Sequence, residues 1–208
     1  MHKSKPKVVA ILGSWSCGST ALTGYIARCG ANTCPPHQRT NDPRTPDSHE
    51  PKALRDALAA RINELSLKKI DYSGSAFREW FSEWLIEEAM KCPEPNPVIL
   101  LKHPLLAYFI TDIQAIAQPY WLVITRPLAR IEATRKRRGW HPVYGEAGAK
   151  VLYGRIFSTL MNQNLSARCV AFDEFQRSPD FRDQLITSLG LQPKADQYAA
   201  AETWLTPP

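Results

Sequence analysis

Short, continuously apolar runs alternate along the chain with segments in which apolar residues recur at helical spacing. The runs 8–12, 98–101, 121–124 and 169–172 predict strands that are buried on both faces of a parallel sheet. Helices are predicted from Ser19 to Gly30 and between the second and third runs. Two further apolar stripes predict helices that face the core, the first formed by Leu54, Leu58, Ile62 and Leu65 and the second by Phe77, Trp80, Phe81, Trp84 and Leu85. This alternation indicates a three-layer α/β fold with a mostly parallel central sheet flanked by helices.

The composition is that of a globular protein. A chain of 208 residues with 44% hydrophobic residues can bury a core, and residues 1–208 are expected to form one domain. The segment 31–51 holds five prolines, two histidines and two arginines, which predicts a long connection that carries substrate contacts.

The charge and the cysteines narrow the function classes. A formal charge of +6 suits a small anionic ligand better than a nucleic acid. The longest apolar stretch, 105–110, is too short to cross a membrane, and Gly13 interrupts the first apolar run before it reaches the length of a secretory signal. Five cysteines without a CxxC pair suggest neither disulfides nor a zinc site, so a cytoplasmic location is expected. Neither the oligomeric state nor a partner chain is encoded.

A glycine loop follows the first predicted strand. From Gly13 to Thr20 the chain reads GSWSCGST and leads directly into a helix, so that backbone N–H groups can converge on a phosphate. The spacing matches that of a P-loop, except that Ser19 stands where the P-loop lysine would reach the terminal phosphates of a nucleoside triphosphate. The alternative is a tight strand-to-helix turn with no ligand.

This loop resembles that of the sulfotransferase family, most closely a bacterial branch whose loop reads GMHRSGTSAL. Gly13, Gly18, Ala21 and Leu22 match that pattern, while Ser16 replaces its basic residue and Cys17 a serine. The resemblance implies a P-loop-type fold and, as co-substrate, 3′-phosphoadenosine 5′-phosphosulfate. The residues it implies around the 5′-phosphate are Ser14, Trp15, Ser16, Cys17, Gly18, Ser19 and Thr20.

A second motif of the family follows the strand 121–124. Arg126, Pro127 and Thr134 resemble the motif R-x-P-x-x-x-x-x-S, whose arginine and serine bind the 3′-phosphate of the nucleotide. Arg138, four residues further on, is a minor candidate for the same phosphate. The alternative for Arg126 is a salt bridge at the sheet edge, and for the basic run 135–138 a solvated helix end.

Three residues are candidates for the chemistry. Lys102, at the end of the strand 98–101, is our candidate for the positive charge that Ser16 does not supply. His103 is the candidate base for an acceptor hydroxyl, because histidine exchanges protons near neutral pH, and Glu50 is the second candidate. Glu50 ends a stretch, beginning at Asn41, Asp42 and Pro43, that loosely resembles the acceptor side of the family. The segments 98–104, 170–175 and 181–191 extend the resemblance.

The resemblance predicts transfer of a sulfuryl group to a hydroxyl of an unidentified acceptor, a carbohydrate or a small metabolite. Two alternatives stay open, which are a P-loop kinase for small molecules and a catalytically impaired nucleotide-binding relative. The missing loop lysine counts against the kinase, and Ser16 keeps the impaired relative open. No metal is expected, since His37, His49 and His141 lie in predicted loops without the spacing of metal ligands.

Overall fold

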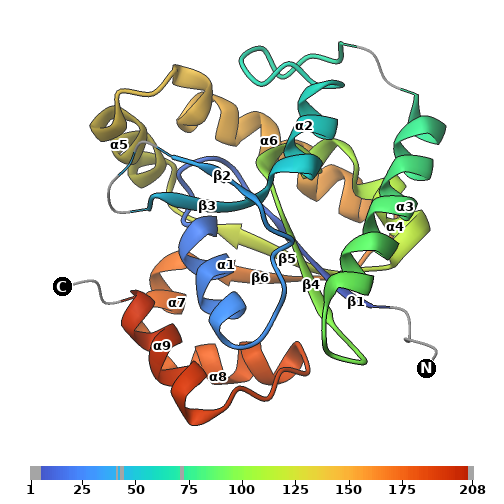
Figure 1. Ribbon diagram of the computed structural model, residues 1–208. Helices are drawn as coiled ribbons and strands as arrows, with labels where there is room; N and C mark the ends of the chain where they lie inside the picture. Colours follow the sequence, from blue (N-terminus) through green and yellow to red (C-terminus); the bar gives the residue numbers. More distant parts are fainter. Residues whose placement is uncertain (1–5, 41, 43–44, 71–72, 206–208) are drawn as a thin grey trace.

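The central sheet contains four parallel strands (Figure 1). A computed structural model describes residues 6–40, 42, 45–70 and 73–205. The strands are β1 (Lys7–Leu12), β4 (Val98–Lys102), β5 (Tyr120–Thr125) and β6 (Ala167–Ala171), in the order β4-β1-β5-β6. The structure therefore confirms the predicted α/β fold with a parallel sheet. Since the chain leaves β1 toward β4 on one side and then crosses to β5 on the other, a ligand is expected beyond the carboxyl end of β1.

Helices cover both faces of the sheet, and the alternation of side chains along β1 assigns them to two cores. Val8, Ala10 and Leu12 pack with residues of α2 (Lys52–Ala59), α3 (Gly74–Lys91), α4 (Ile110–Ala117) and α6 (Glu146–Asn162). Val9 and Ile11 pack with residues of α1 (Ser19–Arg28), α5 (Leu128–Arg138), α7 (Phe172–Arg177), α8 (Pro179–Ser188) and α9 (Ala195–Leu205). Short 3₁₀ helices occupy Pro104–Tyr108 and Pro142–Tyr144. The fold is thus a three-layer arrangement.

The segment 31–51 is not only a connection, because it contains a small antiparallel sheet. The strands β2 (His37–Arg39) and β3 (Asp47–Pro51) pair with each other and lie over α1 and the end of β4 (Figure 1). The prediction of a long loop was therefore wrong. Its buried positions are polar, with Ser48 at 4%, His49 at 9% and Glu50 at 8% exposure, so no apolar pattern marked the strand.

Two smaller predictions had the wrong bounds. The helix predicted to reach Leu65 ends at Ala59, and Leu65 is 53% exposed within the turn that the bridge between Ile62 and Lys69 closes. The last strand begins at Ala167, and Phe172 already belongs to α7. The aromatic stripe of α3 does face the core, with Trp80 half-buried. Within the described residues, no helix combines the length and hydropathy that a membrane crossing needs.

Candidate functional site

A cavity of about 830 Å³ opens where the four parallel strands end. Its wall takes residues from the loop after β1, the end of β4, the segment after β5, the first residue after β6, the β2–β3 hairpin and α9. Of the sequence-predicted site residues, the structure places around it Trp15, Ser16, Gly18, Ser19, Thr20, Glu50, Lys102, Arg126, Thr134 and Arg138. Ser14, Cys17 and His103 are buried next to it and do not line it.

The glycine loop has the backbone that a strand-to-helix turn requires. Gly18, at φ 97°, precedes α1, and a Cβ atom there would lie 2.2 Å from the ring of Phe172. No side chain caps α1, so the N–H groups of its first turn, at Ser19 and Thr20, have no partner within the helix. Ser16 also has a positive φ of 62°. The loop therefore presents unpaired helix-terminal amides to the cavity, as an anion site does.

Arg126 joins the loop to the segment after β5. Its Nη1 donates to the carbonyl oxygen of Ser16 at 3.2 Å and to Oγ1 of Thr134 at 3.1 Å, and its guanidinium lies 4.8 Å from the centre of the Phe172 ring. Its Nε is buried and has no hydrogen-bond partner among the described residues. Burial lowers the pKa of Arg126, and the charge of Asp173 only partly offsets this. A half-buried guanidinium with an unused donor is suited to an anionic ligand.

Thr134 and Arg138 already have hydrogen-bond partners within the protein, which the sequence motif does not suggest. The hydroxyl of Thr134 donates to the carbonyl oxygen of Arg130 at 3.0 Å, so it would have to turn to reach a phosphate. Arg138 donates from Nε to Asp42 at 2.6 Å and from Nη2 to Thr45 at 3.1 Å. The charge of Arg138 is therefore paired within the protein.

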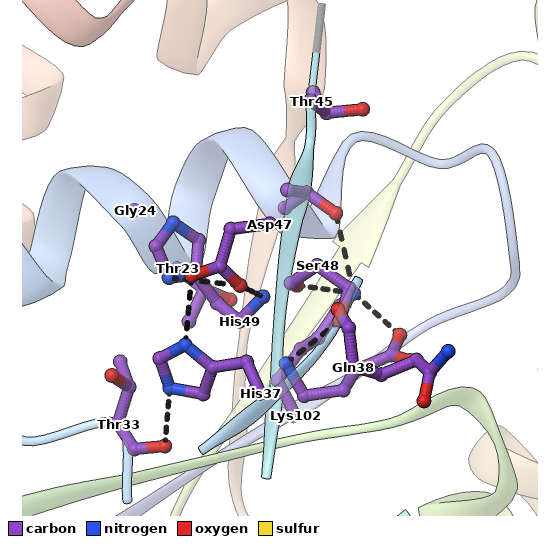
Figure 2. A network of polar contacts seen from close by, with 12 residues as sticks. Thr23, Gly24, Thr33, His37, Gln38, Thr45, Asp47, Ser48, His49 and Lys102 are labelled. Carbon is purple, nitrogen blue, oxygen red and sulfur yellow. Dashed lines mark hydrogen bonds and ion pairs between the residues drawn. The ribbon is translucent and has the colours of Figure 1, made fainter. Parts of the chain in front are cut away.

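Lys102 and Glu50 form a buried ion pair on the opposite wall. The Lys102 ammonium is 2.6 Å from Oε1 of Glu50, 3.0 Å from the carbonyl oxygen of Ser48 and 3.2 Å from Oγ1 of Thr20. Figure 2 shows Lys102 directed at Ser48 of the hairpin. Burial alone would raise the pKa of Glu50, but the positive charge of Lys102 and the nearby His103 outweigh it, and the pKa is lowered. The ammonium thus contacts both the glycine loop and the carboxylate.

His103 has a different environment. Its side chain is 1% exposed, and its Nδ1 accepts the backbone N–H of Leu105 at 3.1 Å. Nε2 faces two carboxylates, at 3.5 Å from Glu64 and 3.9 Å from Glu50. Since the lone pair of Nδ1 is already used, the proton of the neutral ring lies on Nε2. His103 is therefore placed to orient Glu50 and Glu64 rather than to face the cavity.

Several residues of the cavity wall carry no motif that sequence reasoning could use. Gln38 and Arg39 come from the unforeseen hairpin, and Trp204 comes from α9, an alanine-rich helix without a motif. The Trp204 indole donates to the carbonyl oxygen of Ala21 at 3.0 Å, and the Arg28 guanidinium stacks 4.1 Å from its ring. Asn41 and Pro43, which the sequence linked to an acceptor, lie outside the described residues.

The fold and the placement of the cavity define a P-loop-like α/β class, with a glycine loop after the first strand and an arginine after the neighbouring strand. Solved structures support this assignment. The sulfotransferase domain of the olefin synthase from Synechococcus PCC 7002 has a TM-score of 0.53 and 16% identity, over 98% of this chain and 88% of that chain. A sulfotransferase from Mycobacterium avium has a TM-score of 0.52 and 13% identity, over 99% of this chain and 69% of that chain.

At this identity the two likenesses show the fold. The chain therefore has a sulfotransferase-like fold, as the motif resemblance predicted. No family model matches the sequence, and no curated protein matches it either.

Proposed function

We propose that the protein transfers a sulfuryl group from 3′-phosphoadenosine 5′-phosphosulfate to a hydroxyl of a small acceptor, and that residues 1–208 act as one sulfotransferase-like P-loop domain. The observation that carries the proposal is the contact between two anion-binding elements. Arg126 lies 3.2 Å from the carbonyl oxygen of Ser16 and shares a cavity with the loop amides of Ser19 and Thr20. Two such elements suit a nucleotide that carries phosphates at both its 3′ and 5′ ends.

The residues present fit the nucleotide. The first turn of α1 supplies amide donors for the 5′ end, and the buried, unpartnered Nε of Arg126 supplies a charged donor for the 3′-phosphate. Ser16, Gly18, Thr134 and Arg138 complete the proposed pocket. Ser14 and Cys17 support the loop from beneath, because their side chains are buried outside the cavity.

In the proposed reaction Glu50 is the base and Lys102 the electrostatic stabiliser. Glu50 accepts the proton of the acceptor hydroxyl as the new oxygen–sulfur bond forms. The sulfur–oxygen bond to the nucleotide breaks, and the leaving phosphate oxygen keeps the electron pair. Lys102, 3.2 Å from Thr20, stabilises the charge that develops on this oxygen. As the ammonium turns from Glu50 toward the leaving oxygen, the carboxylate becomes more basic, so the two events assist each other.

This assignment prefers Glu50 to His103 as the base. Glu50 lines the cavity, whereas His103 is 1% exposed and its Nδ1 lone pair accepts the N–H of Leu105. A base must reach the proton that it removes, so geometry decides between them. His103 then lies behind Glu50, with its Nε2 3.9 Å from the carboxylate.

One observation favours a second candidate, a nucleotide-binding protein without transfer activity. The hydroxyl of Ser16 donates to the carbonyl oxygen of Tyr144 at 3.2 Å, so the loop position that is basic in the resembled branch supplies no charge. In such a protein the Lys102–Glu50 pair would stabilise the fold and have no role in turnover.

Ligand-induced stabilisation tests the nucleotide site. Adenosine 3′,5′-bisphosphate at about 100 times its dissociation constant should stabilise the protein by about 2.7 kcal/mol, and AMP at the same concentration by much less. Arg126→Ala should remove the difference between the two nucleotides. Arg130→Ala is the matched control, because Arg130 follows Arg126 by four residues, in the first turn of α5, but pairs with Asp173 and does not line the cavity. Equal stabilisation by both nucleotides would contradict the 3′-phosphate assignment.

An activity assay separates the remaining candidates. Purified protein, the phosphosulfate nucleotide and a panel of hydroxyl acceptors should yield adenosine 3′,5′-bisphosphate and a product heavier by one sulfuryl group, detected by mass spectrometry. Lys102→Met and Glu50→Gln should each abolish the product while bisphosphate binding persists. Binding without product across the panel would favour the inactive candidate, and consumption of ATP with magnesium would indicate the kinase instead.

A further inference from the structure

Three metal-ligand side chains meet on the face of the hairpin that does not carry the Lys102–Glu50 pair. In β3, Ser48 and Glu50 line the cavity, and the alternation of a strand turns Asp47 and His49 to the other side. Figure 2 shows His37, Asp47 and His49 together on one side of β3, with Ser48 and Lys102 on the other. The ligand atoms of these three side chains all lie within 4.8 Å of one another.

His49 is the member that protein contacts do not explain. It is 9% exposed, and neither ring nitrogen has a hydrogen-bond partner among the described residues. Its Nδ1 is 3.9 Å from Oδ1 of Asp47, too far for a hydrogen bond. The ring sits edge-on between His37 and Trp204, with centres 5.4 and 5.5 Å away. Buried imidazole nitrogens without a partner are costly unless something else binds them.

His37 already has the orientation of a metal ligand. Its Nε2 is 3.0 Å from the carbonyl oxygen of Thr33, which can only accept, so Nε2 carries a proton (Figure 2). Its Nδ1 faces Oδ2 of Asp47 at 2.9 Å. In this metal-free arrangement Nδ1 donates to the carboxylate, and a bound ion would take the place of that proton. The outer N–H on the Thr33 carbonyl would then hold the ring as it is held in metal-ligating histidines.

The distances suit a single ion. In a tetrahedral zinc site with bonds of about 2.0–2.1 Å, neighbouring ligand atoms are about 3.3 Å apart. His37 Nδ1 is 2.9 Å from Oδ2 of Asp47 and His49 Nδ1 is 3.9 Å from its Oδ1, on either side of that value, and one ligand atom from each residue lies within 4.8 Å of the others. Side-chain shifts of about 1 Å therefore bring all three atoms to bonding distance. Two imidazoles and one carboxylate form a donor set that Zn²⁺ accepts readily.

We propose that His37, Asp47 and His49 bind one Zn²⁺ ion, or a first-row divalent ion that prefers the same ligands, and that this ion stabilises the β2–β3 hairpin. The site was not visible in the sequence, because the ligands are brought together by the hairpin and not by spacing along a helix. The ion would tie β2 to β3 on the face opposite the cavity. Its role is structural, since Ser48 and Glu50 on the other face of β3 hold the Lys102 ammonium.

Metal titration tests the site without depending on the proposed reaction. After treatment with EDTA and its removal, the wild-type protein should bind one Zn²⁺ per chain in calorimetry or in competition with a chromogenic chelator. Zn²⁺ should raise the melting temperature by several degrees, and Mg²⁺ should not. Added Co²⁺ should give the visible absorption of a tetrahedral nitrogen and oxygen site, a readout that needs no variant.

Variants locate the ion. His49→Gln and Asp47→Asn should each weaken Zn²⁺ binding by more than about 100-fold, since loss of an outer-shell partner alone costs about 10- to 100-fold. His141→Gln is the control, because His141 lies outside the cluster and caps a 3₁₀ helix. If the wild type shows no stoichiometric binding, or if His49→Gln binds as tightly as His141→Gln, the cluster is an ion pair of His37 and Asp47 only and the proposal is wrong.

Discussion

Replacing Lys102 by methionine tests the physics of the buried pair most directly. The ammonium is 4% exposed and Glu50 is 8% exposed, so the substitution leaves a carboxylate in the interior. The His103 ring then remains near the carboxylate, with its Nε2 3.9 Å from Oε2 of Glu50. Breaking a buried pair from one side costs about 3–5 kcal/mol. For a chain of this length, that loss lowers the melting temperature by roughly 6–20 °C.

A second substitution separates two contributions to this loss of stability, the missing ion pair and the buried carboxylate that is left without a partner. Glu50→Gln on the Lys102→Met background removes the buried carboxylate, so the double variant should be more stable than Lys102→Met alone. Glu50→Gln alone should also destabilise the protein, since it leaves the ammonium with only the neutral oxygens of Ser48 and Thr20. The two singles should therefore be strongly non-additive in a double-mutant cycle. In the proposed reaction none of the three variants is active, so restored stability should not restore turnover.

The direction in which stability changes with pH can also be predicted. In the wild type the pKa of Glu50 is lowered, because Lys102 and His103 outweigh the effect of burial. Its stabilising contribution is then present above the unfolded pKa of about 4.3 and lost as the pH falls through the folded value. Without Lys102, burial dominates and the folded pKa exceeds the unfolded one. The stability gap between wild type and Lys102→Met should therefore narrow on acidification from pH 7 to 4.

The assay is reversible urea unfolding followed by far-ultraviolet circular dichroism, at pH 7 and at half-unit steps down to pH 4. The double variant is the internal control, because it has no carboxylate at residue 50 and the gap between it and wild type should follow a different pH course. A loss below about 1 kcal/mol for Lys102→Met at pH 7, or a gap that does not change with pH, would refute the reasoning, since either result means that the pair is effectively solvated.

Two further predictions concern the loop and the hairpin. Gly18→Ala should lower the free energy of unfolding by about 1–3 kcal/mol and weaken bisphosphate binding, because φ is 97° and the new Cβ would lie 2.2 Å from the Phe172 ring. Gly154→Ala, within α6 and with no atom near the new Cβ, should stabilise the protein by about 0.5–1 kcal/mol, and thermal unfolding of both variants measures the difference. Burial lowers the pKa of His49 from 6.5 to about 4, so between these pH values the unfolded state binds more protons than the folded state. The free energy of unfolding of the metal-free protein should therefore fall by about 3 kcal/mol from pH 6.5 to pH 4. If urea unfolding shows the same dependence of this free energy on pH in His49→Gln, the assignment to His49 is wrong.

The central sheet was predictable because burial leaves a plain signature. In a parallel strand covered on both faces the buried residues form a continuous apolar run, as residues 8–12 of β1 do. A strand-to-helix turn at φ 97° favours glycine at residue 18. The edge strand β6 shows where the signature fails. Only Val170 of its five residues is buried, so the apolar run misplaced the beginning of this strand by two residues.

The hairpin was not predictable for the opposite reason. Its interior is polar, since Ser48, His49 and Glu50 are buried through contacts with groups distant in sequence. The Lys102 contacts span 52 and 54 residues, and the cluster of His37 with Asp47 forms only when two short strands pair. Hydrophobic periodicity carries no information on such pairs, because they are stabilised by charge and hydrogen bonding and not by a repeating apolar face.

The charges of the cavity explain how a loop without a basic residue at position 16 could still serve the proposed reaction. Lys102 is neutralised by Glu50 and Arg138 by Asp42, whereas Arg126 is held by neutral oxygens and the Phe172 ring. Attraction for a resting nucleotide should therefore come from Arg126 and the loop amides, which bind its two ends in the proposed function, and from the wall residues Arg28 and Arg39. A cation paired with the base contributes little to ground-state binding but is available when negative charge develops beside Thr20. Stabilisation that appears only in the transition state accelerates the chemical step.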